Sequence, residues 1–312
     1  VKKDTEPLLG RNPFVLKDDE WKLSRQQLIP AFSSEKIKNM FPLIENVSKR
    51  LVNYIEHQIA SPSAGQCQNA KELCAKFTCD NVVLCGFGLE ANCFEDPNSE
   101  FNQLAKSMIP VDGLQGIKFG LTLVLPRLTN LLSIKLLPKV AEDKLMSIVS
   151  ETLNYRKKEH VERNDFFAFV TQCSPEDDKL IEISAHLANF IFDGYETTSN
   201  SMVMTLLELA QNQECQKKAR EDTNKALNNH DGVFSYDALQ EMTYLEACIN
   251  EGLRMHPQLA SLNKTCTETY KMETPNPEYE ALSVVIEPGT PVIIPAFGLH
   301  MDPKHYPEPE RF

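Results

Sequence analysis

The sequence predicts a mainly α-helical fold with a minor β-sheet, on two observations. Apolar residues recur at intervals of three and four over most of residues 17–257, which is the spacing of one face of a helix. Runs of β-branched residues are confined to the part after Pro257. The 312 residues, 42% hydrophobic and 24% charged, have the composition of an ordinary globular protein with a substantial core. We therefore expect one domain over residues 1–312, mostly helical at 1–257 and with a β-hairpin and loops at 258–312.

Eight helical segments are expected before Pro257, and their ends are placed by capping residues, acidic first turns, glycines and prolines. The expected segments are residues 17–30, 33–60, 69–84, 97–109, 138–162, 175–211, 214–227 and 236–255. After Pro257, the runs 284–286 and 292–294 flank a Pro-Gly turn. This arrangement predicts a small β-hairpin.

Charge and cysteine content exclude several classes of protein. The net charge of −12 argues against a general binder of nucleic acid. Residues 121–137 form the most apolar stretch, but Pro126, Arg127 and Lys135 interrupt it. This stretch is compatible with contact with a membrane surface and equally with packing on its own domain. The nine cysteines include no Cys-x-x-Cys pair, and their spacing fits reduced, packed thiols better than disulfides or a zinc site.

The segment 192–198, Phe-Asp-Gly-Tyr-Glu-Thr-Thr, interrupts an apolar helical pattern. Gly194 in a helix interior costs about 1 kcal/mol relative to alanine, and the hydroxyl of Thr197 can bond back to the preceding turn and bend the helix. One interpretation is a kinked core helix with a satisfied polar pocket. The other is a helix against which a ligand lies, with Gly194 allowing a close approach. In that case Glu196 and Thr197 form an acid–alcohol pair suited to relaying protons.

Two other residue pairs have helical spacing. Trp21 and Arg25 lie four apart, so their side chains form a donor pair for a planar carboxylate ligand or, alternatively, stack on each other at the surface. Glu251 and Arg254 lie three apart, which permits a buried, multiply bonded ion pair. The spacing alone is weak, because residues 308–311 share it although their proline excludes a helix interior.

Taken in order, the motifs resemble those of the cytochrome P-450 superfamily. They are Trp-x-x-x-Arg, Gly-x-Glu-Thr-Thr, Glu-x-x-Arg, Pro-Gly-Thr-x-Val and His-x-Asp-Pro. The segment Cys-Gly-Phe-Gly-Leu-Glu at 85–90 is similar to one in the microsomal detoxifying branches of insects and vertebrates. The resemblance implies a haem-thiolate monooxygenase that inserts one atom of O2 into a lipophilic substrate, such as a xenobiotic, a steroid or a fatty acid. It also implies electrons from NADPH through a reductase partner, and a place on the cytoplasmic face of the endoplasmic reticulum membrane.

The resemblance also implies roles for individual residues. Trp21, Arg25 and Lys264 correspond to contacts of the haem propionates. Gly194, Glu196 and Thr197 correspond to the oxygen-activating helix, with Thr197 as the proton-delivering hydroxyl. Glu251 and Arg254 correspond to two members of the ion-pair network behind the haem. Phe190, Ile191, Leu259 and Leu262 correspond to residues that contact substrates.

Three departures from the family pattern matter. Asp193 stands where the family usually has alanine, and Lys264 stands where it has an arginine, so the bidentate fork is lost. No cysteine has the Phe-x-x-Gly-x-x-x-Cys context of the axial ligand, so this chain holds no metal ligand. We expect that loop and the network's own arginine to follow Phe312, an anchor to precede Val1, and residues 1–312 alone to be inactive. Two alternatives remain: a non-catalytic helical binding protein that keeps the scaffold, and an unrelated helical domain with chance motifs.

Overall fold

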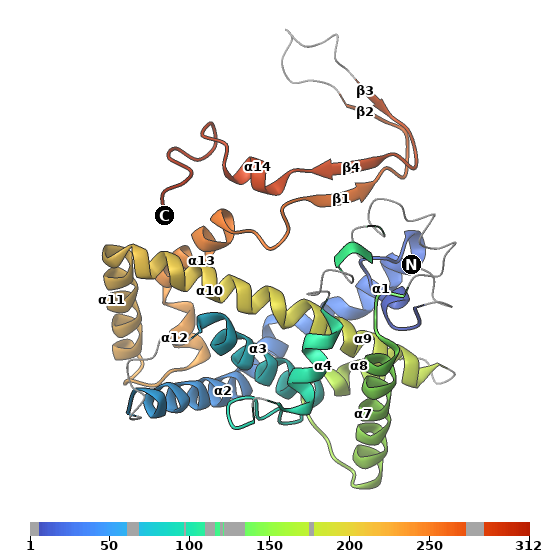
Figure 1. The fold of residues 1–312 in the computed structure, drawn as a ribbon, viewed down its shortest axis with the longest axis horizontal. Coiled ribbons are helices and arrows are strands. Elements are labelled where there is room, and N and C mark those ends of the chain that lie inside the picture. Colours follow the sequence, from blue (N-terminus) through green and yellow to red (C-terminus); the bar gives the residue numbers. More distant parts are fainter. Residues whose placement is uncertain are drawn as a thin grey trace. The chain divides into compact units, whose positions relative to one another are not determined.

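The computed structural model describes residues 6–60, 69–96, 98–109, 116–118, 121, 135–174, 178–272 and 284–312. It consists of two compact units, Val1–Asn200 and Ser201–Phe312, whose boundary falls inside one helix, α10 (Glu196–Gln211). The elements are mostly helical with short antiparallel strand pairs (Figure 1), which confirms the predicted fold class. That the chain forms one domain stays a prediction. Among the described residues, no helix combines the length and the apolar character that spanning a membrane requires.

The first unit is built around the packed helices α3 and α9. Its elements are η1 (Leu9–Arg11), α1 (Asp18–Leu28), η2 (Ile29–Phe32), α2 (Ser34–Ala60), α3 (Ala70–Phe87), α4 (Glu100–Met108), α7 (Lys139–Lys158), α8 (Phe166–Cys173) and α9 (Lys179–Gly194). Phe87, Phe167 and Leu187 are among the side chains buried almost completely in its core. Their burial provides the main stabilisation of this unit, about 1.5–3 kcal/mol for each large side chain.

Helix α3 illustrates how local sequence sets the helix boundaries. The side chain of Asn69 caps its start by accepting hydrogen bonds from the backbone N–H groups of Lys71 and Glu72. The helix continues to Phe87, three residues beyond the expected end, because Gly88 adopts a left-handed φ of +65° and donates to the Leu84 carbonyl. The expected start was therefore correct within one residue, and the end was too early.

Two expected helices are each divided in the structure. The segment 175–211 becomes α9 and α10, separated at Tyr195, and 236–255 becomes α12 (Tyr236–Gln240) and α13 (Thr243–Met255). The second division has a partner outside the segment, since Asp222 Oδ2 accepts a 2.9 Å hydrogen bond from the backbone N–H of Tyr244 at the start of α13. Asp222 belongs to α11 (Gln213–Asn229), which packs on α13. Helix α8 was not expected, although Asp165 caps it by accepting from the Ala168 N–H at 2.9 Å.

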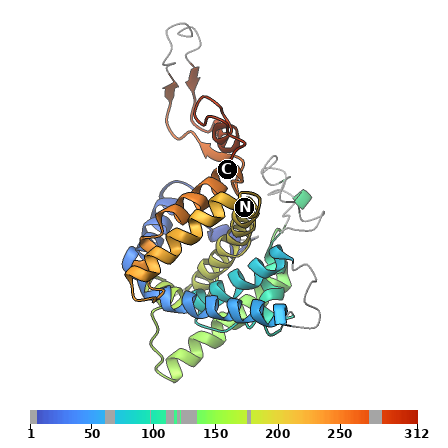
Figure 2. The ribbon, with the colours of Figure 1, turned by 90° about the vertical axis from the view of Figure 1, so that its left-hand side faces the viewer.

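The predicted hairpin between 284–286 and 292–294 is wrong. Instead, β1 (Leu262–Thr265) pairs with β4 (Pro291–Ile294), and β2 (Tyr270–Met272) pairs with β3 (Val284–Ile286), both antiparallel. The two pairs follow one another along a single bent ribbon (Figures 1 and 2). The Pro-Gly turn forms the bend, because Gly289, with φ of +86°, donates to the Cys266 carbonyl while Cys266 donates to that of Thr290. A short helix, α14 (Ala296–His300), follows.

One expectation falls largely outside the described structure. Of the apolar stretch 121–137, the structure describes only residues 121 and 135–137. Its contact with a membrane or with its own domain stays a prediction.

Candidate functional site

The junction of α9 and α10 brings Asp193 and Thr197 to one exposed face. They lie four residues apart, and the Thr197 hydroxyl donates to the backbone carbonyl of Asp193. This is the back-bonding expected from the sequence, and it accompanies the break of the helix at Tyr195. The carboxyl group of Asp193 has no hydrogen bond or ion pair within the described part of the chain. Partial desolvation raises its pKa to about 6.

Glu196 follows the same turn, but its carboxylate is engaged elsewhere. Glu196 Oε1 lies 2.8 Å from Lys71 Nζ, near the start of α3. The same ammonium group donates to Ser199 Oγ at 2.6 Å, and Ser199 is completely buried. The acid that neighbours Thr197 in sequence is therefore held by a lysine of another helix.

Gly194 lies where α9 passes close to α3. A Cβ atom added there would stand 2.9 Å from Val82 Cγ2, closer than carbon atoms normally approach. Packing therefore gives a sufficient reason for glycine at this position. The predicted approach of a ligand to Gly194 stays a prediction.

Replacing Gly194 with alanine is expected to lower the free energy of unfolding by about 1–2 kcal/mol, because overpacking against Val82 outweighs the gain in helix propensity. Chemical unfolding followed by circular dichroism measures the change. Placing Gly194→Ala in a Val82→Ala background removes the methyl group it would meet, so the alanine should then cost less than in the wild-type background. An equal cost in both backgrounds would show that Val82 is not the obstacle.

The four predicted substrate-contact residues fall into two groups. Phe190 stacks on Phe166 with ring centroids 4.6 Å apart, and Ile191, 2% exposed, lies in the core of the first unit. Leu259 and Leu262 are exposed at the start of the strand region. The first two are thus occupied by packing, and contact of any of the four with a substrate stays a prediction.

The predicted propionate contacts are all exposed cations and donors. Trp21, 42% exposed, and Arg25 project from α1, and Lys264 projects from β1. Within the described ranges, Arg25 has no ion pair and does not stack on Trp21. The alternative of a surface stack is therefore not realised, and both donors are available to an anionic group.

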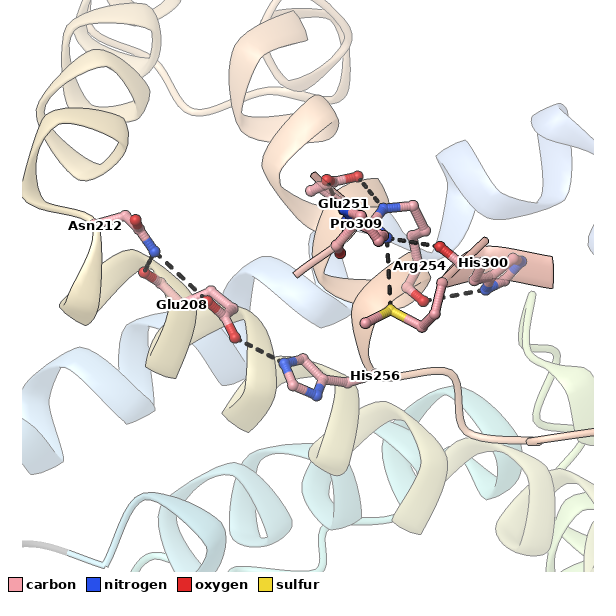
Figure 3. A network of polar contacts seen from close by, with 8 residues as sticks. Glu208, Asn212, Glu251, Arg254, His256, His300 and Pro309 are labelled. Atoms are coloured by element: carbon pink, nitrogen blue, oxygen red, sulfur yellow. Dashed lines mark hydrogen bonds and ion pairs between the residues drawn. The ribbon is translucent and has the colours of Figure 1, made fainter. Parts of the chain in front are cut away.

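Among the described residues of the second unit, Arg254 forms an extensive polar network (Figure 3). Its guanidinium binds both oxygens of Glu251, with Nη2–Oε1 and Nε–Oε2 distances of 2.7 and 2.8 Å. It also donates to the carbonyls of His300 and Pro309, both at 2.8 Å, and lies over the ring of Tyr306. The side chain is 7% exposed, and its hydrogen bonds to Glu251 raise its pKa further. The predicted ion pair is present, with Arg254 buried and Glu251 37% exposed, whereas Glu308 and Arg311, at the same spacing, pair on the surface.

A second polar contact, not expected from the sequence, joins the end of α13 to α10. His256 Nε2 lies 2.7 Å from Glu208 Oε1, and Glu208 also accepts from the side chain of Asn212 (Figure 3). One turn earlier, a Cβ on Gly252 would lie 2.6 Å from Thr205 Oγ1, so the two helices are in close contact there. The Glu-x-x-Arg helix is thus fixed on both sides. The signal for this contact in the sequence is the charged Glu208 in the mostly apolar segment 202–210.

No group of three or more His, Cys, Asp or Glu side chains in the described ranges could hold a metal ion. Four of the clustered cysteines, Cys74, Cys79, Cys85 and Cys93, are buried free thiols. Burial raises the pKa of Cys85 to about 12, so this thiol is protonated and unreactive at neutral pH.

The comparisons with known proteins agree with this arrangement. The sequence model of a family described as cytochrome P450 matches residues 1–312. The curated Drosophila melanogaster proteins "Probable cytochrome P450 6a19", "Probable cytochrome P450 6a14" and "Probable cytochrome P450 6a20" are each 34% identical to this chain, over 97%, 98% and 97% of it. The chain spans 60–62% of the length of these relatives.

Proposed function

The chain belongs to the cytochrome P450 family, and from this premise we propose that the whole protein is a haem-dependent monooxygenase. It inserts one atom of O2 into a lipophilic organic substrate, such as a xenobiotic, a steroid or a fatty acid. Electrons come from NADPH through a reductase partner, on the cytoplasmic face of the endoplasmic reticulum membrane. The observation that supports this most directly is the match of the family model to all 312 residues.

The residues present fit a haem group. Trp21 and Arg25 offer an indole N–H and a guanidinium that no acidic side chain of the described residues occupies, as binding of a propionate requires. Lys264, also exposed, stays the cation that the family resemblance assigns to the other propionate. Bound haem supplies the activation of O2.

The protein's own part in the proposed reaction is binding and proton delivery. Thr197 holds a proton on its hydroxyl at the break between α9 and α10, and a carboxyl group of the same turn can replace it. The network of Glu251 and Arg254 keeps the Glu-x-x-Arg helix fixed, so that the surrounding scaffold is preorganised.

A carbon monoxide difference spectrum of the reduced whole protein tests the proposal. We expect the Soret band that gives the family its name. A folded whole protein without that band, and without bound haem, would instead support the non-catalytic binding protein.

Thr197→Ala in the whole protein, supplied with reductase, NADPH and a fatty acid, is expected to raise peroxide released per NADPH by several-fold and to lower product. The reason is that a relay group typically contributes about 10²–10⁴-fold to a proton transfer. Thr198→Ala is the matched control, since the next residue points about 100° away around the helix. Unchanged peroxide with Thr197→Ala, or an equal rise with Thr198→Ala, would remove the relay role of Thr197.

A further inference from the structure

We propose that a small pocket between α2 and α8 binds a short-chain aliphatic carboxylate, at a site separate from the one assigned to haem. The pocket has a volume of about 50 Å³, and all the residues that line it belong to the first unit. None of the residues assigned above to haem, substrate or proton delivery lines it. The proposal therefore does not depend on the proposed monooxygenase function.

The inner wall of the pocket is apolar. Phe166 and Phe169 lie three apart on α8, so their rings share one face of that helix. Phe166 also stacks on Phe190 of α9, with ring centroids 4.6 Å apart, and this contact fixes the wall in place. Ala31 and Ala168 line the pocket with single methyl groups and leave its space open. That volume has room for about four water-sized groups, so an aliphatic chain of three or four carbons fits.

The mouth of the pocket carries two cations. Lys36, in the first turn of α2, and Arg163, just before α8, line the pocket and are exposed. Within the described ranges, neither side chain has an acidic partner. Arg163 Nη1 donates to the carbonyl of Gly88 at 2.6 Å, which leaves its remaining N–H groups for a ligand. A carboxylate at the mouth can therefore accept hydrogen bonds from a guanidinium and an ammonium group together.

One acidic residue also lines the pocket, but its charge is already compensated. Both oxygens of Asp165 accept from Arg156, at 2.9 and 2.6 Å, and Oδ1 accepts in addition from the backbone N–H of Ala168. The charges of Lys36 and Arg163 are therefore the uncompensated ones. This net positive charge favours an anion over a neutral or cationic ligand of the same shape.

The length of the ligand tests the fit to the pocket. Saturation-transfer NMR measures the Kd of acetate, butyrate, pentanoate and octanoate with the whole protein. Burial of each added carbon should strengthen binding about fourfold as far as pentanoate, and octanoate should gain little more, because its further carbons extend into solvent. Pentanamide, which has the same chain and no charge, should bind several-fold more weakly than pentanoate. Absence of pentanoate binding, or equal binding of the amide, would overturn the proposal.

Variants at the mouth and at the wall locate the site. Lys36→Met should weaken pentanoate binding several-fold, and Lys36→Arg should keep it. Lys38→Met is the matched control, because Lys38 lies two positions further along α2 and does not line the pocket. Ala168→Leu adds three carbons to the wall and should abolish the gain with chain length. If Lys36→Met binds pentanoate as tightly as wild type, or if Lys38→Met weakens binding equally, the ligand is not in this pocket. Circular dichroism checks that each variant is folded, and the lysine variants decide the matter if Ala168→Leu is not.

The absorption spectrum of the haem separates this pocket from the site assigned to haem. Pentanoate in the pocket should leave the Soret band unchanged, because no residue assigned to haem lines the pocket. A shift of the Soret band with the same Kd in wild type and Lys36→Met would place the ligand at the haem and overturn the proposal. If the whole protein holds no haem, the monooxygenase function fails, and the binding measurements still decide whether the pocket takes a carboxylate.

Discussion

Arg254→Leu is expected to lower the free energy of unfolding by about 2–4 kcal/mol, because it leaves two backbone carbonyls without their donor and the 37% exposed Glu251 carboxylate without its cation. Most of this cost comes from the two carbonyls, since the Glu251 carboxylate is partly accessible to water. Arg254→Lys keeps the charge but loses the bidentate fork, so its effect should be intermediate. Hydrogen exchange of peptides from α13, compared with peptides from α3, measures the loss and locates it in the second unit.

Arg311→Leu is the matched control for this prediction. Arg311 also lies three residues after a glutamate, but it is 76% exposed and its partner Glu308 is 72% exposed. Exposed pairs contribute about 1 kcal/mol or less. If the two leucine variants lowered the stability equally, the Glu-x-x-Arg spacing and not the burial of Arg254 would determine the effect.

Gly88→Ala is expected to cost about 4 kcal/mol. Alanine is strained at the φ of +65° that ends α3, and its Cβ would lie 2.6 Å from Arg156 Nη2 and would also contact the Asp165 carboxylate. That guanidinium is bonded to both oxygens of Asp165 and to the Phe87 carbonyl, so a shift would disturb an ion pair whose side chains are only 12% and 2% exposed. Urea unfolding followed by circular dichroism measures the loss.

Gly232→Ala is the control that separates the cost of the backbone conformation from the cost of crowding by the added Cβ atom. Gly232 has a similar φ of +77°, but a Cβ there would have nothing within 4 Å. This variant should cost only about 1 kcal/mol, the price of the backbone conformation alone. Equal losses in the two variants would mean that the ion pair around Gly88 adjusts freely.

Local sequence patterns predicted most helices well. The pairing of the strands was predicted wrongly, because it depends on residues far apart in the sequence. The cap at Asn69 and the acidic first turn of α1 are visible within a few residues, so the starts of these helices were placed within one residue. The strands β1 and β2 carry polar residues and short apolar runs. Their pairing depends on partners 12 to 32 positions away along the chain, of which Leu262 with Ile294 is the most distant. The turn 287–290 therefore looked like the loop of a hairpin, although it forms the bend of a longer ribbon.

In the candidate site, too, contacts between residues near in sequence could be predicted and contacts between distant residues could not. The ion pair of Glu251 and Arg254 lies within one turn of helix, and its spacing predicted it directly. The pair of Lys71 and Glu196 joins residues that are 125 positions apart, which no local pattern reveals. That contact holds the carboxylate of the acid that directly precedes Thr197.

The reach of Arg254 along the chain has a consequence for the order in which the second unit forms. Its two backbone acceptors, His300 and Pro309, are 46 and 55 residues further along the sequence. A ribosome adding about 5–20 residues per second makes Pro309 about 3–11 seconds after Arg254. During that interval Glu251, in the same turn of helix, is the partner within immediate reach, and it holds the guanidinium until the later carbonyls arrive. The last steps at this site are then the closure of two long loops onto one preformed ion pair, which makes Arg254 the point at which the segments around His300 and Pro309 dock.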